Sequence, residues 1–407
     1  MSCISRVLIL AFATLLTIGL VGSTFHVGAQ DKKDKKKEDA KDKKEDAKDK
    51  KDVAKDKKEV AKDKKDEKKE EKIEKKEPFK PDPAQSEFTY ILKGEKDDKE
   101  KTFWVFGVAF GADGKTVAAT YRDNTVHIWD IAAKKDIQTL KGNPTETKAL
   151  LFAKGEILVS TGKWNKEKKA WEGEIKVWDK AGKSGKSLKG HSAPIEYLAL
   201  SKDGKFLATA SEDKTVIIWD LAAGKETQTL KGHTETVNSV SFSPDGKQAV
   251  TTSADKTVRV WDLAGPKEIA LFKVEREVEI KDAKGKVSKQ KELGREFTRA
   301  VFTSDGKNVI AGNLDGVIKI YDVEGKKELK ELKAHEGVWA LALSPDGTKL
   351  ATGGYDQTIK IWNVADGKEL KTIKAHLGTV TSISFSPNGE SIASGSIDGT
   401  VKIWSVK

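Results

Sequence analysis

The sequence predicts an all-β fold in which seven similar four-stranded sheets form the blades of a closed ring. A pattern of strands and tight turns occurs seven times between Thr89 and Lys407. In each copy one strand ends at or next to an aromatic residue. Successive aromatic residues are separated by 49, 41, 42, 60, 41 and 42 positions. A repeat of this length built only of strands cannot bury its own apolar faces, so neighbouring copies must pack around an axis. The aromatic residues are Trp129, Trp178, Trp219, Trp261, Tyr321, Trp362 and Trp404.

Residues 1–29 have the features of an export signal. One positive charge in Met1–Arg6 precedes the apolar run Val7–Gly22, and the small residues Val27-Gly28-Ala29 follow. This order predicts cleavage before Gln30 and an exported protein, periplasmic or extracellular. An uncleaved anchor is the alternative, but the apolar run is shorter than the roughly 20 residues that span a bilayer. We expect no transmembrane segment after cleavage.

Residues 30–85 are predicted to be a disordered linker rich in Lys, Asp and Glu. Between Asp31 and Glu77 the chain has 22 Lys against 18 acidic residues and very few apolar ones. A seven-residue repeat is present, but it lacks the two apolar positions that a coiled coil needs. A segment of this composition cannot bury a core. Its small positive excess predicts at most a weak, salt-sensitive contact with an anionic surface.

Residues 86–407 are predicted to form the ring, and the strand at 86–93 is predicted to close it. The seventh copy supplies only three strands before Lys407. Residues 88–94 end in Leu-Lys-Gly, as the fourth strands of several other copies do. The first strand should therefore pair with the last blade. Such closure removes the exposed sheet edges that invite aggregation.

The fourth copy illustrates how each blade is built. The strand Val237–Ser243 alternates apolar and polar residues, as half-buried strands do. Pro244-Asp245-Gly246 is a turn in which proline presets φ and glycine accepts a positive φ. The tight turn Asp255-Lys256 follows the next strand. The remaining strands are predicted at Gln248–Ser253, Thr257–Trp261 and Lys267–Phe272.

These residues resemble the WD-repeat β-propeller family over about 320 residues. The resemblance implies a seven-bladed propeller in which well-formed blades hold a buried, hydrogen-bonded tetrad of His, Ser or Thr, Asp and Trp. The first, second and fifth copies lack the histidine, so we expect apolar packing to hold those blades. The tetrads implied in the other copies are His191, Thr209, Asp213 and Trp219; His233, Thr251, Asp255 and Trp261; His335, Thr352, Asp356 and Trp362; and His376, Ser394, Asp398 and Trp404.

The His-Asp-Ser/Thr sets predict structural networks and no catalysis, because the same set of residues recurs in four copies at the same positions of the repeat. No histidine cluster remains for a metal, and His127 is interpreted as a strand residue. Gly182–Ser187 resembles a phosphate-binding loop, but Lys180 stands where that loop needs glycine. We therefore expect no enzyme activity, no cofactor and no metal. Acids are interleaved with the basic residues throughout, so we expect no nucleic-acid partner.

Three insertions, at 95–102, 163–173 and 273–296, distinguish three copies from the others. By the resemblance these loops emerge on one face of the ring, and insertions gathered on one face often mark a binding surface. Trp is common among the residues that dominate interface energies. The alternative for 163–173 is a hairpin whose Trp pair only holds its own strands together. The candidate binding residues are Trp164, Lys166, Lys168, Lys169 and Trp171 in the second insertion, and Phe106 and Trp339, which the resemblance places near the channel mouth on the same face.

The sequence thus predicts an exported, monomeric propeller that acts as a non-catalytic scaffold for protein–protein interactions, with a partner that the residues do not identify. One alternative is a propeller enzyme or small-ligand binder at the channel mouth. Another is adhesion to an envelope or other surface through the Lys-rich linker.

Overall fold

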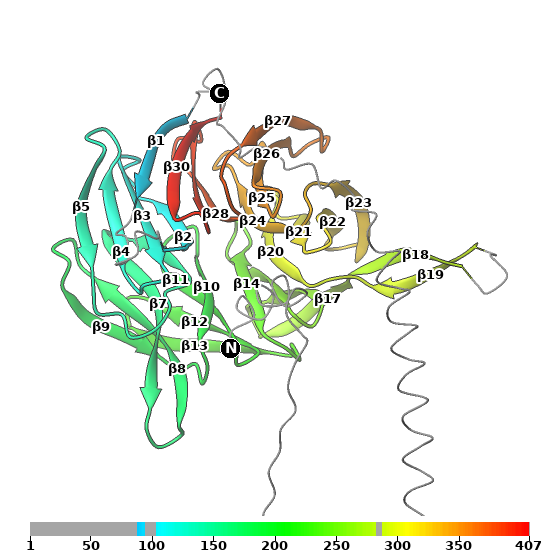
Figure 1. Cartoon of the computed structure of the whole chain (residues 1–407). Helices are drawn as coiled ribbons and strands as arrows, with labels where there is room; N and C mark the ends of the chain where they lie inside the picture. Colours follow the sequence, from blue (N-terminus) through cyan, green and yellow to red (C-terminus); the bar gives the residue numbers. More distant parts are fainter. Residues whose placement is uncertain (1–87, 94–102, 282–286, 407) are drawn as a thin grey trace, which may run out of the picture. The chain divides into compact units, whose positions relative to one another are not determined.

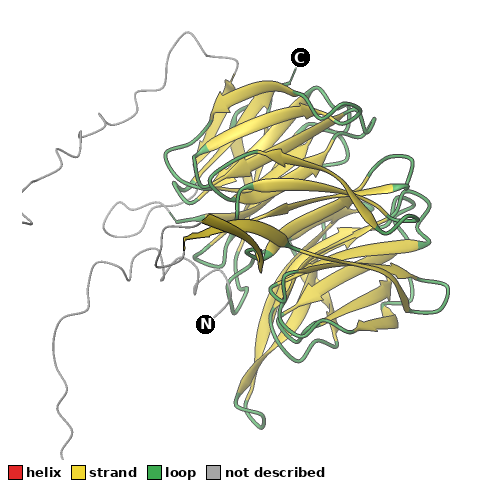
Figure 2. Cartoon of the chain, turned by 90° about the vertical axis from the view of Figure 1, so that its right-hand side faces the viewer, coloured by secondary structure: helices red, strands yellow, loops and turns green. Residues whose placement is uncertain are grey.

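A computed structural model of the chain describes residues 88–93, 103–281 and 287–406, which form an all-β fold. Seven four-stranded sheets follow one another, and a two-stranded hairpin precedes the fifth (Figure 1). Only strands and loops occur in the described residues (Figure 2). The predicted all-β class and the seven blades are confirmed. Residues 1–87, which include the predicted signal and the whole predicted linker, lie outside the described residues, as does the predicted insertion at 95–102.

The seven blades are numbered in chain order. Blade 1 contains β2 (Val105–Phe110), β3 (Thr116–Tyr121), β4 (Val126–Asp130) and β5 (Lys135–Leu140); blade 2 contains β6 (Leu150–Ala153), β7 (Glu156–Asn165), β8 (Ala170–Trp178) and β9 (Ser184–Lys189); blade 3 contains β10 (Ile195–Leu200), β11 (Phe206–Ser211), β12 (Thr215–Asp220) and β13 (Lys225–Lys231). Blade 4 contains β14 (Val237–Phe242), β15 (Gln248–Ser253), β16 (Thr257–Asp262) and β17 (Lys267–Lys273); blade 5 contains β20 (Phe297–Phe302), β21 (Asn308–Asn313), β22 (Val317–Asp322) and β23 (Lys327–Lys333). Blade 6 contains β24 (Val338–Leu343), β25 (Lys349–Gly354), β26 (Thr358–Asn363) and β27 (Glu369–Lys374); blade 7 contains β28 (Val380–Phe385), β29 (Ser391–Ser396), β30 (Thr400–Ser405) and β1 (Phe88–Lys93). The separate hairpin is β18 (Glu275–Lys281) and β19 (Val287–Leu293).

Strand β1 closes the ring, as predicted. It pairs antiparallel with β30, with Tyr90 opposite Ile403 and Leu92 opposite Val401 (Figure 1). The register shifts by one residue at Trp404, which lies opposite Phe88. The outer strands of the other six blades show the same shift at their own Trp or Tyr. β1 therefore occupies the outer position that a fourth strand fills in every other blade.

The predicted turn residues adopt the conformations that their chemistry favours. Gly246 has φ of 72°, a value that glycine reaches without a Cβ penalty. Asp245 Oδ1 accepts a hydrogen bond from the Lys247 amide at 3.0 Å, which fixes the turn. In the tight turn after β15, Lys256 has φ of 67°, and Asp255 Oδ1 accepts from the Thr257 amide at 3.0 Å. The aspartate carboxylates thus replace backbone acceptors at both kinds of turn.

The apolar core lies mainly between neighbouring blades. One cluster joins Ala208 and Ile218 of blade 3 to Val240 and Trp261 of blade 4. Another joins blade 7 to blade 1 and includes Leu92. The first strands of successive blades also contact one another in a closed cycle, which includes contacts between β2 and β28. Each blade is therefore stabilised by both neighbours, and the first strands surround a central channel.

The antiparallel order of the strands places two classes of connection at opposite ends of the blades. Links from second to third strands, and from each blade to the next, share one end, which we call the crossover face. Links from first to second and from third to fourth strands share the opposite face. The insertion at 163–173 lengthens β7 and β8, and the insertion at 273–296 forms β18 and β19 (Figure 1). Both connections belong to the crossover face.

Candidate binding face

The extended hairpin of β7 and β8 exposes a pair of tryptophans. Trp164 lies directly opposite Trp171, and their ring centroids are 5.4 Å apart at an interplanar angle of 65°. The two side chains remain 43% and 40% exposed. Asn165 Oδ1 accepts hydrogen bonds from the amides of Glu167 and Lys168, each at 3.0 Å, which fixes the turn that joins the strands. The hairpin therefore presents two aromatic rings in a defined arrangement.

The tip of this hairpin is also basic. Lys163, Lys166, Lys168 and Lys169 are all exposed. Lys168 Nζ lies 2.8 Å from Glu172 Oε1, and this hydrogen bond holds the pKa of Glu172 below its ordinary value. The hairpin thus combines exposed aromatic surface with an excess of positive charge.

Phe106 and Trp339, the other two candidate binding residues, have different environments. Each is the second residue of a first strand, in β2 and β24. Phe106 is buried, with 7% of its surface exposed, and lines the central channel. Trp339 is half-buried and packs edge-to-face on Tyr355, with ring centroids 5.5 Å apart. Trp339 is therefore the more accessible of the two.

The four predicted tetrads are brought together in their own blades. In blade 4, His233 Nδ1 lies 2.8 Å from Asp255 Oδ2, and His233 Nε2 lies 2.7 Å from Thr251 Oγ1. Trp261 Nε1 donates to the same hydroxyl at 2.9 Å. Equivalent contacts join His191, Asp213, Thr209 and Trp219 in blade 3, His335, Asp356, Thr352 and Trp362 in blade 6, and His376, Asp398, Ser394 and Trp404 in blade 7.

The blades without a tetrad use other contacts. In blade 5, Tyr321 stacks on Phe272 with ring centroids 4.3 Å apart, and Phe297 meets the same ring edge-to-face. In blade 1, His127 stacks on Trp129, and its Nδ1 lies 2.5 Å from Asp136 Oδ2. Blade 5 therefore relies on aromatic packing, whereas blade 1 carries a different histidine–aspartate pair.

Sequence reasoning missed a charged cluster between blades 2 and 3. Lys148 forms buried ion pairs with Glu196, and with Glu212 at 3.1 Å. Burial alone would lower the pKa of Lys148, but the two carboxylates more than offset it and raise that pKa. Burial also raises the pKa of Glu196 to about 7. The sequence signal for this cluster was Glu196, a charged residue in the first strand of blade 3, where the adjacent residues are mostly apolar.

The cavity of the central channel has a volume of about 260 Å³ and is lined by residues from all seven blades. Its lining includes Lys148, Tyr197 and Arg299, together with apolar side chains such as Val108 and Leu198. Polar atoms make up more than half of the surface that lines this cavity, so the channel offers hydrogen-bonding groups beside its apolar side chains.

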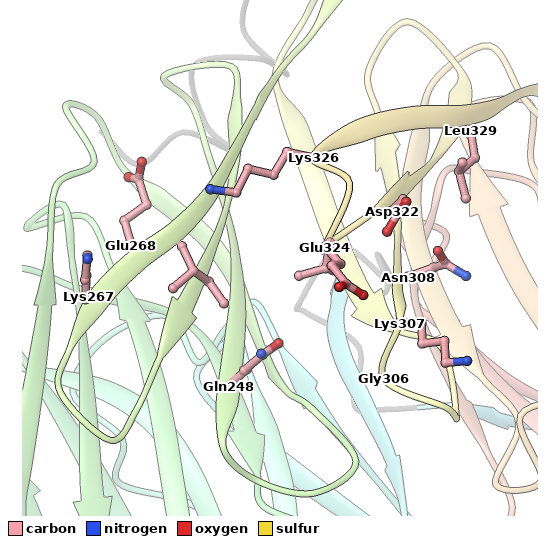
Figure 3. Close-up of a pocket in the computed structure, with 12 residues that line it drawn as sticks. Gln248, Lys267, Glu268, Gly306, Lys307, Asn308, Asp322, Glu324, Lys326 and Leu329 are labelled. Atoms are coloured by element: carbon pink, nitrogen blue, oxygen red, sulfur yellow. The ribbon is translucent and has the colours of Figure 1, made fainter.

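A larger groove lies between blades 4 and 5 on the opposite face. Its volume is about 810 Å³, and Figure 3 shows Lys267 and Glu268 on one side and Lys307 and Asn308 on the other. Lysines alternate with carboxylates along its walls, so it offers no concentrated charge.

Within the described ranges, no three His, Cys, Asp or Glu residues are placed to hold a metal ion. The same ranges contain no helix with the length and hydropathy required to cross a bilayer.

Comparisons with known proteins agree with this architecture. The family model described as "WD domain, G-beta repeat" matches residues 87–130, 182–220, 224–262, 326–363 and 367–405. The unmatched segments 131–181 and 263–325 contain most of blades 2 and 5, which lack a tetrad and carry the two large insertions.

Several curated proteins are similar to part of the chain. Nuclear distribution protein nudF 2 of Penicillium rubens is 27% identical over 145 residues, which cover 31% of this chain and 30% of that protein. Nuclear distribution protein PAC1 of Arthroderma otae is 29% identical over 141 residues, or 31% and 29% of the two chains. LEC14B protein of Lithospermum erythrorhizon is 25% identical over 132 residues, or 31% and 26%. The chain spans less than a third of each relative's length. Five matched repeats within a ring of seven blades show that the chain belongs to the WD-repeat β-propeller family.

Proposed function

We propose that this chain is an exported, non-catalytic scaffold that binds a partner protein through the crossover face. The observation that carries the proposal is the exposed pair Trp164 and Trp171 on the β7–β8 hairpin. Two large aromatic rings that remain open to solvent on a fixed hairpin are a ready contact area, since Trp is enriched among interface hot spots.

The charges around the pair favour an acidic partner surface. Lys163, Lys166 and Lys169 are exposed near the two rings, and Glu172 is already engaged by Lys168. Positive charge at the rim of a contact steers an oppositely charged partner and raises the rate of association. A partner with carboxylates around an apolar patch would match both features.

The order of residues in the first 29 positions supports export. An apolar run of 16 residues follows a basic start and precedes Val27-Gly28-Ala29. N-terminal sequencing of the protein recovered outside the cytoplasm should begin at Gln30. Recovery of intact protein only from the cytoplasmic fraction would contradict export.

Affinity purification of cross-linked full-length protein from the producing cells tests the interaction. We expect the double variant Trp164→Ser/Trp171→Ser to recover at least about tenfold less of a partner protein than the wild type recovers. Leu370→Ser is the matched control, because Leu370 is a large apolar residue that is more exposed than either tryptophan but lies on the outer strand β27. Equal recovery of every partner by the wild type and the double variant, both folded by circular dichroism, would contradict the proposal.

A further inference from the structure

Arg299 places a guanidinium group in the central channel. It is the third residue of β20, and the ring of Tyr197 on β10 lies 4.5 Å beneath its Cζ. Arg299 Nη1 donates to the carbonyl oxygens of Asn238 and Thr298 at 3.0 and 2.9 Å. Tyr197 occupies the equivalent position in blade 3, and small residues occupy it in the remaining five blades: Gly107, Ala149, Ser239, Ala340 and Ser382. The side chain is thus held in a fixed position by three neighbours.

The charge of Arg299 has no carboxylate partner among the described residues. Elsewhere Arg259 Nη1 lies 2.6 Å from Glu268 Oε2, and Arg122 Nε lies 3.9 Å from Glu146. Glu196, whose charge acts on Arg299, is itself bound by Lys148. Burial lowers the pKa of Arg299, which reflects the cost of enclosing an unpaired cation. An anion in the channel would offset that cost.

The remaining donors of Arg299 are available to a ligand. A guanidinium has five N–H groups, and the two carbonyl oxygens engage only Nη1. No described residue accepts a hydrogen bond from Nε or Nη2. One N–H from each of these atoms points in the same direction, which is the geometry that binds both oxygens of a carboxylate.

We propose that the channel holds a binding site for a carboxylate, with Arg299 as the group that recognises it. Among the described residues that line the channel, the cations are Lys148 and Arg299. Lys148 is already shared by two acids, so Arg299 alone is left for a ligand, which favours a singly charged one. The cavity of about 260 Å³ has room for about nine water-sized groups. Leu198 and Ile383 are among the apolar residues of its mixed lining, and they offer a contact for a short hydrocarbon stem.

Two sources could provide this carboxylate: a small free acid, or an acidic side chain of a bound protein. The site is independent of the proposed function, because it requires neither Trp164 nor Trp171. Loss of partner capture by the hairpin variant and loss of carboxylate binding by an Arg299 variant are therefore separate results.

Arginine Nε–H signals in the NMR spectrum of ¹⁵N-labelled full-length protein provide the test, since the chain has only six arginines. We expect propionate to shift the Arg299 signal and propionamide to leave it in place. Acetyl-Ala-Glu-Ala-amide and its Gln analogue form the second pair of probes. Tighter binding of the Glu peptide than of propionate would identify a protein side chain as the source, and the reverse order would identify a free acid.

Arg299→Met and Arg299→Lys have no Arg299 signal, so binding to the variants is measured by isothermal titration calorimetry, which tests whether this side chain is required. Arg299→Met should weaken carboxylate binding by about ten- to a hundredfold, as expected when a hydrogen bond to a charged group is lost. Arg299→Lys keeps the charge without the paired donors and should give an intermediate loss. Arg122→Met is the matched control, because Arg122 also stacks on an aromatic ring, 4.4 Å above Trp104, but on the surface. Binding by Arg299→Met at wild-type strength, equal effects of acid and amide probes, or no shift with either acid would overturn the proposal.

Discussion

His233 and Asp255 lie 22 residues apart in the chain and are joined by a 2.8 Å contact between Nδ1 and Oδ2. The other ring nitrogen of His233 meets Thr251, which also accepts from Trp261. Every polar atom of the imidazole therefore has a partner inside blade 4. A network of this kind stiffens a blade only while all its members are satisfied.

Replacing His233 by alanine should lower the free energy of unfolding by about 1–3 kcal/mol, because Thr251 and Asp255 would lose a buried partner. Chemical denaturation of the variant and the wild type measures the difference. Thr234→Ala serves as the control, since only its backbone amide bonds to Asp255. A loss of stability as large in the control as in His233→Ala would contradict the network.

The ionisation of Asp255 should make the free energy of unfolding depend on pH in the acidic range. Burial alone would raise its pKa, but the hydrogen bonds from His233 and Thr257 hold that pKa far below its ordinary value. The unfolded chain therefore takes up the proton first as pH falls, so this stabilisation is complete above about pH 4 and is lost below it. We expect Asp255→Asn to be less stable at pH 7 and the gap to narrow between pH 4 and pH 2. Urea denaturation at stepped pH measures the gap, and a constant gap would show that Asp255 does not titrate in this way.

Glu196 should produce the opposite dependence. Its folded-state pKa of about 7 exceeds the ordinary value of 4.5, so between these pH values the folded state holds the proton that the unfolded state has released. Stability from this group therefore falls as pH rises from about 5 to about 8. Glu196→Gln, which leaves Lys148 its partner Glu212, should remove that part of the slope. Parallel stability profiles of the variant and the wild type over this range would disprove the assignment.

Leu92 should be essential to the closed ring. It is 4% exposed and packs in the cluster that joins blades 7 and 1, so Leu92→Ala should cost about 2–5 kcal/mol. Looser packing of β1 would also uncover the edge of β30 and increase aggregation, which light scattering detects. Leu370→Ala provides the comparison, because Leu370 is 54% exposed and its loss should change stability by less than about 0.5 kcal/mol. Similar melting curves for both variants would contradict this role of β1.

Most of the fold could be predicted because short sequence patterns specify its strands and turns, and these patterns recur in each blade. The turn at Asp255-Lys256 and the glycine at 246 each depend on neighbours within a few residues. The pairing of β1 with β30 joins distant segments, yet it was predictable because residues 88–94 end like the other fourth strands. Because the blades repeat, a short sequence ending was enough to predict a pairing between strands that are far apart in the chain.

The contents of the channel could not be predicted in the same way. Lys148, Glu196 and Arg299 come from blades 2, 3 and 5, and their contacts depend on how side chains of different blades meet. A repeat pattern specifies the strands but does not specify which inward positions carry charge. Phe106 and Trp339 illustrate the same limit, since equivalent positions give one buried and one half-buried ring.

The pairing of β1 with β30 has a consequence for synthesis. The ribosome makes β1 before any other strand of the ring and makes its partner last. At about 5–20 residues per second, the roughly 310 residues between them take about 15 to 60 s to translate. A nascent chain must therefore carry six blades and an unpaired first strand until β30 emerges from the ribosome. Premature termination within β30 would leave six complete blades and a seventh without the strand that pairs with β1, so the ring could not close.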